Sequence, residues 1–213
     1  MNMKRWIIFD MMGVIFTVGD DTNDLLVPFV QKINSNISAN VINELYREAS
    51  LGNMSSKQFW GGMGVVGEHM IHKIEKEYLD SCLTLDPLFT EVAARLSEKY
   101  NLAILSNDIS EWSLYLREKF NINQVIKTAI ISGDVHCRKP EMSIYLKILE
   151  HIDAAPQDCV FIDDRDKNLV PAMKLGMKVL RFFREDSECL IRNIMTTSSF
   201  RDLEECIELC WEK

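Results

Sequence analysis

The sequence predicts an α/β protein with a Rossmann-like parallel sheet flanked by helices and an inserted α-helical segment. Three observations predict this class. A short apolar run at residues 6–9 is typical of a buried parallel strand. Residues 18–84 show helical periodicity. From Pro87 onward helical and apolar segments alternate, which is the pattern of βαβ units in a parallel sheet.

The expected elements follow this pattern in order. The first strand ends at Asp10, where a carboxylate interrupts the apolar run and Gly13 opens a turn. Later strands are expected at residues 102–106, 126–132, 159–163 and 178–182. Helices are expected at residues 25–33, 41–49, 57–60, 71–83, 88–99, 111–120, 141–151, 168–175 and 200–211. Because strands and helices alternate, we expect helices on both faces of the sheet.

Two serines mark helix starts within residues 18–84. Ser38 stands where it can cap the helix at 41–49. Ser55 and Gln58 have the spacing of a capping box, in which each side chain satisfies a free backbone donor of the other residue. These signals support a helical insert that joins the core at about residues 18 and 84.

Composition restricts the partners of the chain. It holds 24 basic and 32 acidic residues, a formal net charge of −8, and acidic residues are concentrated in residues 185–213. Such a chain repels phosphate backbones, so we expect no nucleic-acid partner. No run approaches the roughly 18 apolar residues of a membrane span, so we expect no membrane partner. The chain is expected to be a monomer or a homodimer.

The cysteines and the first residues bear on the compartment. The six cysteines lack the paired spacing of a zinc site and are predicted to be free thiols. Lys4 and Arg5 ahead of an apolar run resemble the start of a secretory signal, but Asp10 interrupts that run and no Ala-x-Ala site follows. We therefore expect a cytoplasmic protein.

Polar side chains follow the predicted strands where each of them ends. Asp10 ends the first strand and Ser106-Asn107 ends the second. Lys139 follows the third strand, and Asp163-Asp164 ends the fourth. Because ligands of open parallel sheets bind at the carboxyl ends of the strands, we expect these side chains to meet in one crevice.

This set of side chains suits phosphoryl transfer to or from a small phosphorylated substrate. Paired carboxylates hold Mg²⁺, which prefers a substrate phosphate as a further ligand. A carboxylate also serves as a nucleophile that forms an aspartyl-phosphate. Ser106 and Lys139 are placed to stabilise the remaining phosphoryl charge.

Four short motifs in order carry a resemblance to a known family. They are residues 9–14 (Phe-Asp-Met-Met-Gly-Val), residues 104–107 (Ile-Leu-Ser-Asn), residues 138–141 (Arg-Lys-Pro-Glu), and residues 161–164 (Phe-Ile-Asp-Asp) followed by Asn168. With them the chain resembles the haloacid dehalogenase-like hydrolase superfamily. Residues 52–55 look like the cap turn of its branch with the epoxide-hydrolase phosphatase domain and the sugar phosphatases.

The resemblance implies an organisation and a role for each motif residue. The core domain would comprise residues 1–17 and 85–213, and the helical cap domain residues 18–84. Asp10 would be the nucleophile and a Mg²⁺ ligand, with the Met12 carbonyl and Asp164 as further ligands. The remaining roles are phosphoryl binding by Ser106 and the Asn107 backbone, charge neutralisation by Lys139, pairing of Asp163 with Lys139, and support from Asn168.

One position departs from the family pattern. Family phosphatases usually carry a second aspartate, a general acid and base, two positions after the nucleophile, and here that residue is Met12. General acid–base help contributes about 10²- to 10⁴-fold in rate, so we expect a slow phosphatase. Two alternatives stay open: a metal-independent 2-haloacid dehalogenase, and a catalytically impaired scaffold that binds a phosphorylated ligand. Family dehalogenases carry an aromatic residue at that position, and Asp163-Asp164 favours a metal.

Four further signals are given structural interpretations. Residues 62–67 fit the G-x-G-x-x-G fingerprint, but a helical run precedes them where a dinucleotide site requires a strand. His69 and His72 are expected to be solvated, since no third metal ligand is near. Trp60 and Met63 could line a substrate pocket, but core packing is favoured for both. Arg47 could reach a substrate anion, but a surface role is favoured.

Overall fold

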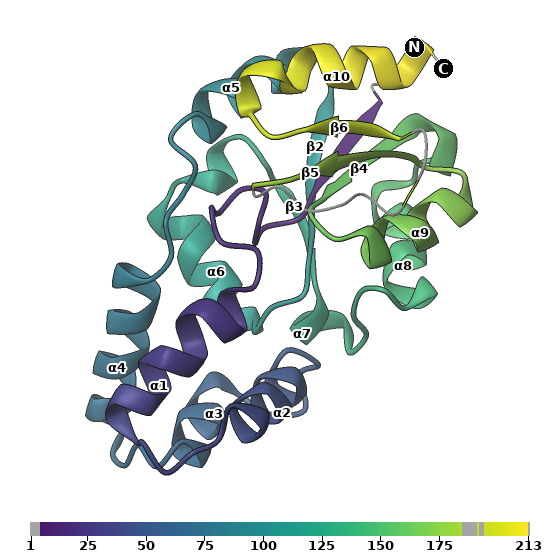
Figure 1. Cartoon of the computed structure of the whole chain (residues 1–213). Coiled ribbons are helices and arrows are strands. Elements are labelled where there is room, and N and C mark those ends of the chain that lie inside the picture. The colour runs from purple at the N-terminus through teal and green to yellow at the C-terminus, as the bar shows by residue number, and fades with distance from the viewer. Residues whose placement is uncertain (1–4, 185–190, 192–193, 213) are drawn as a thin grey trace.

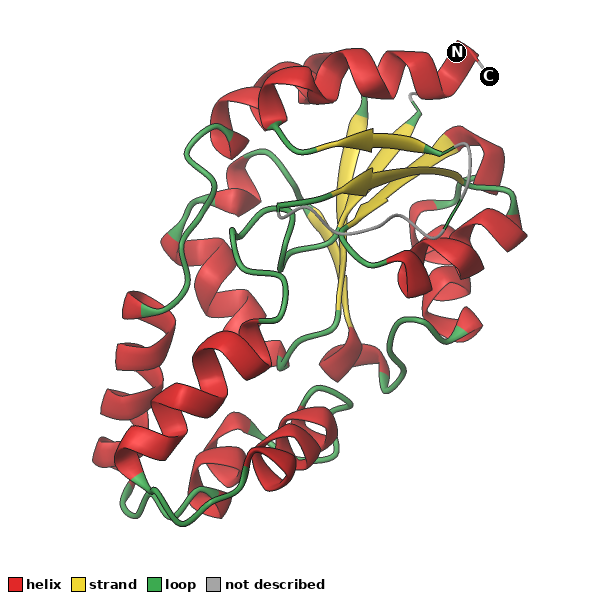
Figure 2. Cartoon of the chain, in the orientation of Figure 1, coloured by secondary structure: helices red, strands yellow, loops and turns green. Residues whose placement is uncertain are grey.

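The computed structural model of the chain describes residues 5–184, 191 and 194–212. These residues form a six-stranded sheet with the order β3-β2-β1-β4-β5-β6, and every neighbouring pair is parallel (Figures 1 and 2). The strands are β1 Trp6–Phe9, β2 Asn101–Ser106, β3 Thr128–Ile131, β4 Cys159–Asp163, β5 Lys178–Phe182 and β6 Met195–Thr197. The predicted α/β class with a parallel sheet is confirmed.

The register of the central strands aligns their carboxyl ends. Phe9 of β1 lies opposite Ile104 of β2 and opposite Ile162 of β4. Asp10, which follows Phe9, and Asp163, which follows Ile162, therefore lie at the same height along the two neighbouring strands β1 and β4. The backbone N–H of Asp10 extends the ladder by donating to the carbonyl of Ile162 at 2.9 Å.

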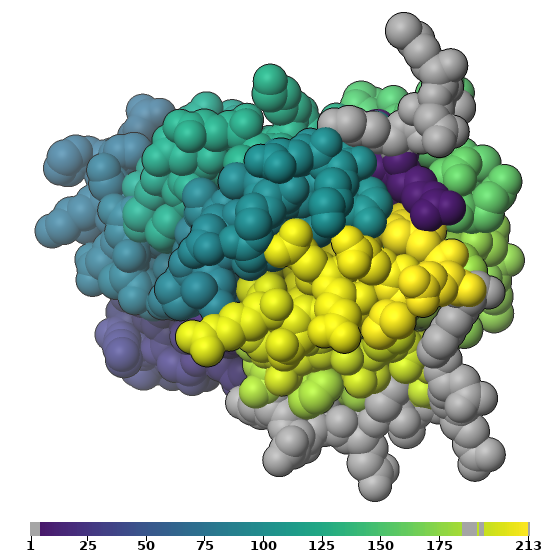
Figure 3. Space-filling model, turned by 90° about the horizontal axis from the view of Figure 1, so that it is seen from above, coloured from purple at the N-terminus to yellow at the C-terminus, as the bar shows by residue number. Residues whose placement is uncertain are grey.

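Alternate residues of the strands enter two separate cores, as expected for a sheet that is covered on both faces. Ile7 and Phe9 belong to one buried cluster, and Ile8 between them belongs to the other. Helices α5 Phe89–Lys99, α6 Ser110–Lys119 and α10 Phe200–Glu212 contribute to the first cluster. Helices α8 Met142–Ile152 and α9 Asp166–Leu175 contribute to the second. Figure 3 shows α10 at the surface, with the blue-green α5 beside it.

A helical segment is inserted between β1 and α5. It comprises the π-helix η1 Thr22–Leu26, α1 Val27–Ile33, α2 Ala39–Ala49, α3 Ser56–Gly62 and α4 Glu68–Ser81. Its two connections run beside each other, because Phe16 bridges Leu85 in antiparallel fashion and the N–H of Thr17 donates to the carbonyl of Thr84. In Figure 1 these helices lie at the end of the molecule opposite α10.

Buried aromatic rings join the inserted helices to the sheet side of the molecule. Trp112 of α6 packs against Phe59, Trp60 and Tyr78 with ring centroids 5.3–5.9 Å apart. The indole N–H groups of Trp112 and Trp60 both donate to Glu75 Oε2, at 2.8 and 3.0 Å. Such packing fixes the position of these helices over the strand ends.

Most predicted elements are present, with differences at their ends. The helix predicted at 25–33 begins as the π-helix η1 and continues as α1. The strand predicted at 126–132 is shorter, because Ser132–Val135 forms the one-turn helix α7. Strand β6 and the short 3₁₀-helices η2 Ile122–Gln124 and η3 Pro156–Asp158 were not predicted. Both predicted caps are present: Ser38 accepts from the N–H of Val41, and Ser55 with Gln58 forms a complete capping box.

The structure also tests the expectations for the core residues, the glycine fingerprint and the cysteines. Trp60 and Met63 are buried in the core, as predicted. A helix and not a strand, α3, precedes the glycines at 62–67, so the dinucleotide fingerprint lacks its required context. Five cysteines are free thiols, and Cys189 lies outside the described residues. Within the described part of the chain, none of the helices is both long enough and apolar enough to span a bilayer.

Candidate active site

Lys139 is the centre of a buried ionic cluster at the carboxyl ends of the strands. Its Nζ lies 2.8 Å from Asp10 Oδ1 and 2.7 Å from Asp163 Oδ2. The Lys139 and Asp163 side chains are 1% and 0% exposed, and that of Asp10 is 9% exposed. One ammonium group thus bridges two carboxylates that the strand register has already brought level.

The loop after β1 orients the Asp10 carboxylate. The N–H of Met11 donates to Asp10 Oδ1 at 2.7 Å, so this oxygen accepts from both the backbone and Lys139. The chain then folds back, with the N–H of Gly13 donating to the carbonyl of Val18 at 2.9 Å. Met12 lies on this loop and lines the cavity described below.

Asp163 accepts three hydrogen bonds from two neighbours besides Lys139. Asn168 Nδ2 donates to both of its carboxylate oxygens, at 3.0 and 3.1 Å, and the N–H of Arg165 donates to Oδ1 at 2.8 Å. Asn168 is itself fixed, because Tyr145 donates its hydroxyl to the Asn168 carbonyl at 2.7 Å. Asp163 therefore has a fixed position from which it orients Lys139. Both of its buried carboxylate oxygens accept hydrogen bonds, so neither is left unsatisfied.

Asp164 completes a group of three acids. Oxygen atoms of Asp10, Asp163 and Asp164 all lie within 4.8 Å of one another. Oδ1 of Asp164 is buried without a hydrogen-bond partner among the described residues. Two glycines make room for this side chain, since a Cβ atom on Gly13 or Gly19 would collide with the Asp164 carboxylate. Clustered carboxylate oxygens with an unsatisfied member match the hard oxygen ligands of Mg²⁺.

Burial and mutual repulsion shift the pKa values of these groups. Burial raises the pKa of Asp10 well above its usual range, and the charges of Asp163 and Asp164 raise it further, although the Lys139 ammonium opposes both effects. Burial and the neighbouring Asp163 raise the pKa of Asp164 to about 6. Burial alone would lower the pKa of Lys139, but Asp10 and Asp163 raise it, so Lys139 is charged.

The second strand contributes Ser106 and Asn107. The Asn107 side chain binds the backbone of Lys139 on both sides, donating to its carbonyl at 2.9 Å and accepting from its N–H at 2.8 Å. Ser106 is 1% exposed, and its Oγ has no hydrogen-bond partner among the described residues. A buried hydroxyl without a partner is costly unless a ligand satisfies it.

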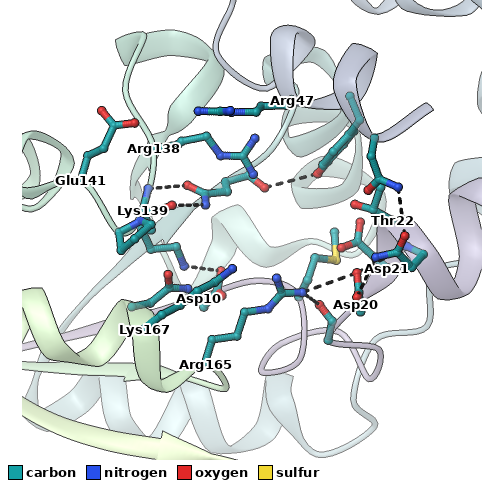
Figure 4. A pocket seen from close by; sticks show the side chains of 18 residues that line it. Asp10, Asp20, Asp21, Thr22, Arg47, Arg138, Lys139, Glu141, Arg165 and Lys167 are labelled. Atoms are coloured by element: carbon teal, nitrogen blue, oxygen red, sulfur yellow. Dashed lines mark hydrogen bonds and ion pairs between the residues drawn. The ribbon is translucent and has the colours of Figure 1, made fainter. Parts of the chain in front are cut away.

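A cavity of about 550 Å³ lies between the strand ends and the inserted helices (Figure 4). Its lining includes Asp10, Met12, Asn107, Lys139 and Asn168 among the predicted site residues. Asp163, Asp164 and Ser106 are not part of the lining. Asp163 supports the lining residue Lys139 through its ion pair, and Ser106 and Asp164 directly precede the lining residues Asn107 and Arg165.

Several lining residues were not predicted as site residues. Asp20, Asp21 and Thr22 line the cavity at the start of the inserted helices, and Arg165 lines it from the start of α9. Arg47 is exposed, as its predicted surface role requires, and it also lines the cavity from α2. His69 and His72 are exposed, as predicted.

Comparison with known proteins identifies a family. The family model of haloacid dehalogenase-like hydrolases matches residues 7–182, which contain all of the cluster described above. The matched range extends from β1 to the end of β5 and includes the inserted helices and the site.

Curated relatives are similar over shorter stretches. Flavin mononucleotide hydrolase 1 of Arabidopsis thaliana is 33% identical over 76 residues, which cover 36% of this chain and 31% of the relative. Bifunctional epoxide hydrolase 2 of Rattus norvegicus is 28% identical over 123 residues, covering 56% of this chain and 20% of the relative. The matches thus span a third or less of these relatives' own length.

Solved structures share the fold. A haloacid dehalogenase family enzyme of Bacteroides thetaiotaomicron, bt-2542, superposes with a TM-score of 0.73 at 18% identity, covering 89% of this chain and 97% of the other. The same enzyme in complex with magnesium and inorganic phosphate gives a TM-score of 0.69 at 20% identity, covering 88% and 97%. The 2-haloacid dehalogenase of Pseudomonas syringae pv. tomato gives 0.73 at 11% identity, covering 97% and 99%.

Proposed function

Because the chain belongs to the haloacid dehalogenase-like hydrolase family, we propose that it is a Mg²⁺-dependent phosphatase that hydrolyses a small phosphorylated metabolite through an aspartyl-phosphate at Asp10. The observation that carries this proposal is the bridge from Lys139 to Asp10 and Asp163, with the Asp164 carboxylate beside it. The similarity to a flavin mononucleotide hydrolase, and to a fold solved with magnesium and phosphate, supports it.

The three acids fit a divalent cation. Asp10 and Asp164 would hold the ion together with the main-chain carbonyl of Met12. Oδ1 of Asp164 accepts no hydrogen bond among the described residues and is therefore a ready ligand. When bound, Mg²⁺ supplies positive charge that offsets the carboxylates and the phosphoryl oxygens. Asp163 serves a different purpose in this proposal, because its two oxygens are already engaged by Lys139, Asn168 and the backbone.

The first half-reaction uses Asp10 as the nucleophile. A carboxylate oxygen attacks phosphorus, and the bond from phosphorus to the leaving oxygen breaks with its electron pair. The leaving oxygen then takes a proton from solvent. Lys139 neutralises charge on the transferred phosphoryl group, and the Ser106 hydroxyl and the Asn107 N–H donate to its oxygens.

The second half-reaction returns the enzyme to its starting state. A water oxygen attacks phosphorus and the bond to the Asp10 oxygen breaks, which releases inorganic phosphate and restores the carboxylate. The water gives up its protons to solvent and phosphate. Residues 18–84 act as a cap domain over a core of residues 1–17 and 85–213, so that Thr22 and Arg47 face the substrate from the cap.

Met12 limits the rate of both half-reactions, because a thioether transfers no proton. We predict that Met12→Asp raises kcat by roughly 10²-fold, the lower end of what general acid–base catalysis contributes. Steady-state hydrolysis of 4-nitrophenyl phosphate and of glycerol 3-phosphate checks this, with thermal melting to confirm folding. An unchanged or lower rate in the folded variant would contradict this account of position 12.

The function is tested by a screen of phosphorylated metabolites with Mg²⁺ or with a chelator. We expect phosphate release that requires Mg²⁺ and falls at least 10³-fold in Asp10→Asn, whereas Asp24→Asn, an exposed acid on η1, retains it. Halide release from 2-haloacids without metal would instead identify a dehalogenase. Phosphate binding without any turnover would identify a scaffold. Either result overturns the proposal.

A further inference from the structure

A second basic wall lines the cavity, and the proposed phosphatase chemistry does not use it. Arg47 reaches the cavity from α2, and Arg138 reaches it from the loop before α8, one residue ahead of Lys139. Figure 4 shows the two side chains beside each other at the top of the view, with Asp10 and Lys139 below them. Burial lowers the pKa of Arg138, and the charges of Arg47 and Arg165 lower it further.

A buried serine holds the Arg138 guanidinium in place and also contacts the backbone of Arg47. Ser50, which is 0% exposed, accepts from Arg138 Nη1 at 2.7 Å and donates its own hydroxyl to the Arg47 carbonyl at 3.0 Å. The Ser50 carbonyl in turn accepts from the hydroxyl of Ser132, at the start of α7. The wall is therefore built from the inserted helices and the strand-end loops together, and the Arg138 guanidinium has a fixed position.

The positive charge of this wall is only partly offset. Glu141 also lines the cavity and its charge favours the charged form of Arg138, but among the described residues no carboxylate forms an ion pair with Arg47 or Arg138. Arg165 on the same cavity pairs with Asp20 and Asp164. Two neighbouring guanidinium groups repel each other, and partial burial of Arg138 adds a desolvation cost. An anion between them removes both costs, and a guanidinium fork matches the two oxygens of a carboxylate or phosphate.

We propose that Arg47 and Arg138 bind a second anionic group of the substrate, so that the enzyme acts on metabolites that carry a carboxylate or a second phosphate besides the phosphoryl group that it removes. This proposal rests on the phosphatase function proposed above. Lys139 and the carboxylates receive the reacting phosphoryl group at the strand ends, and the arginine wall receives the other end of the same small molecule. A cavity of about 550 Å³ has room for a metabolite of this size.

Two matched substrate pairs test the proposal by steady-state kinetics with Mg²⁺. One pair is 3-phosphoglycerate and glycerol 3-phosphate, which differ by a carboxylate. The other is fructose 1,6-bisphosphate and fructose 6-phosphate, which differ by a phosphate. We expect kcat/KM to be at least about tenfold higher for the member with the second anion in one pair, and the pair that responds identifies the anion.

Variants connect that preference to the two arginines. Arg47→Met and Arg138→Met should each reduce the preference about tenfold or more, mainly through KM, and Arg138→Lys should retain part of it because an ammonium keeps the charge without the fork. Arg201→Met on α10 removes the same charge at the far end of the molecule and should leave the preference unchanged. Equal kcat/KM within both pairs, or a preference that survives both methionine variants, overturns the proposal.

A binding measurement separates failure of this proposal from failure of the phosphatase. Calorimetry on Asp10→Asn with Mg²⁺ compares the affinities for 3-phosphoglycerate and glycerol 3-phosphate, and for the two fructose phosphates, without turnover. If wild type hydrolyses no substrate, 4-nitrophenyl phosphate included, the phosphatase function is wrong. If the member with the second anion binds more tightly and Arg138→Met abolishes this difference, the arginine site is still supported. Equal binding within both pairs overturns the arginine site.

Discussion

Gly19 is the residue whose missing side chain matters most for the candidate metal site. A Cβ atom there would lie far inside van der Waals contact with Asp164 Oδ2. The backbone of Gly19 does not adopt a positive φ, so alanine meets no conformational barrier and acts only through this collision. We predict that Gly19→Ala displaces the Asp164 carboxylate and weakens Mg²⁺ binding by about 10- to 100-fold, as measured by calorimetry.

A second glycine provides the control for that measurement. A Cβ atom on Gly61, within α3, would meet no atom within 4 Å. Gly61→Ala should leave Mg²⁺ binding unchanged and stabilise the helix by up to about 1 kcal/mol, because alanine has the higher helix propensity. Equal Mg²⁺ affinity in the two variants would show that Asp164 does not bind the ion.

Asp21 makes stability depend on pH. Burial raises its pKa to about 7, the neighbouring Asp20 and Asp164 add to this, and Arg165 opposes it. The folded state therefore keeps a proton that the unfolded state has lost, so this contribution to stability is complete below about pH 4 and is lost as the pH rises to about 7. The loss amounts to about 1.4 kcal/mol per pH unit at most.

Asp21→Asn should remove this dependence. We predict that the variant gains free energy of unfolding relative to wild type as the pH rises from about 4 to about 7, by a few kcal/mol in total. Urea denaturation at several pH values in the presence of a chelator measures the difference. A difference between the two proteins that stays constant over this range would contradict the raised pKa.

The sequence predicted the site residues at the strand ends, but it did not predict that residues of the inserted helices line the same cavity. Asp10 and Asp163 each end an apolar run, and in a parallel sheet this places them at one edge whatever the strand order. Asp21 and Arg47 reach the cavity because the inserted helices pack on Trp112. That packing is a tertiary contact, and no local pattern encodes its direction.

At the scale of elements, the capping box of α3 makes a measurable contribution to the free energy of unfolding. Ser55 Oγ accepts from the N–H of Gln58 at 3.2 Å, and Gln58 Oε1 accepts from the N–H of Ser55 at 2.8 Å. We predict that Ser55→Ala lowers the free energy of unfolding by about 1–2 kcal/mol. Ser38→Ala, which removes one longer cap bond of 3.4 Å, should cost about 0.5–1 kcal/mol. Chemical denaturation that ranks the two in the opposite order would contradict this reading.

The elements that the sequence did not predict have only weak local sequence patterns. Strand β6 has three residues, and its pairing with β5 adds an edge where no long apolar run exists. The π-helix η1 begins three residues before the predicted helix, because Asp20 side-chain oxygens accept from the backbone and side chain of Asn23 and order this start. The long apolar strands and periodic helices were predicted, since each carries its own pattern.

At the scale of the whole molecule, the strand order explains why distant motifs meet. Strand β1 lies between β2 and β4, so Asp10 has the second motif on one side and the fourth on the other. The sequence did not predict this order, because β2 and β4 are similarly apolar and each is compatible with the central position.

Mg²⁺ is therefore expected to stabilise the whole fold. The unfolded chain holds Asp10 and Asp164 apart, so the ion binds the folded state alone and adds about 2.7 kcal/mol to the free energy of unfolding at 100 times its dissociation constant. Asp164→Asn should melt higher than wild type without metal, because one repelling charge is gone, yet gain little from Mg²⁺. Scanning calorimetry over a Mg²⁺ series measures both effects, with Asp24→Asn as the control. If Mg²⁺ raised the melting temperature of Asp164→Asn as much as that of wild type, the ion would bind elsewhere.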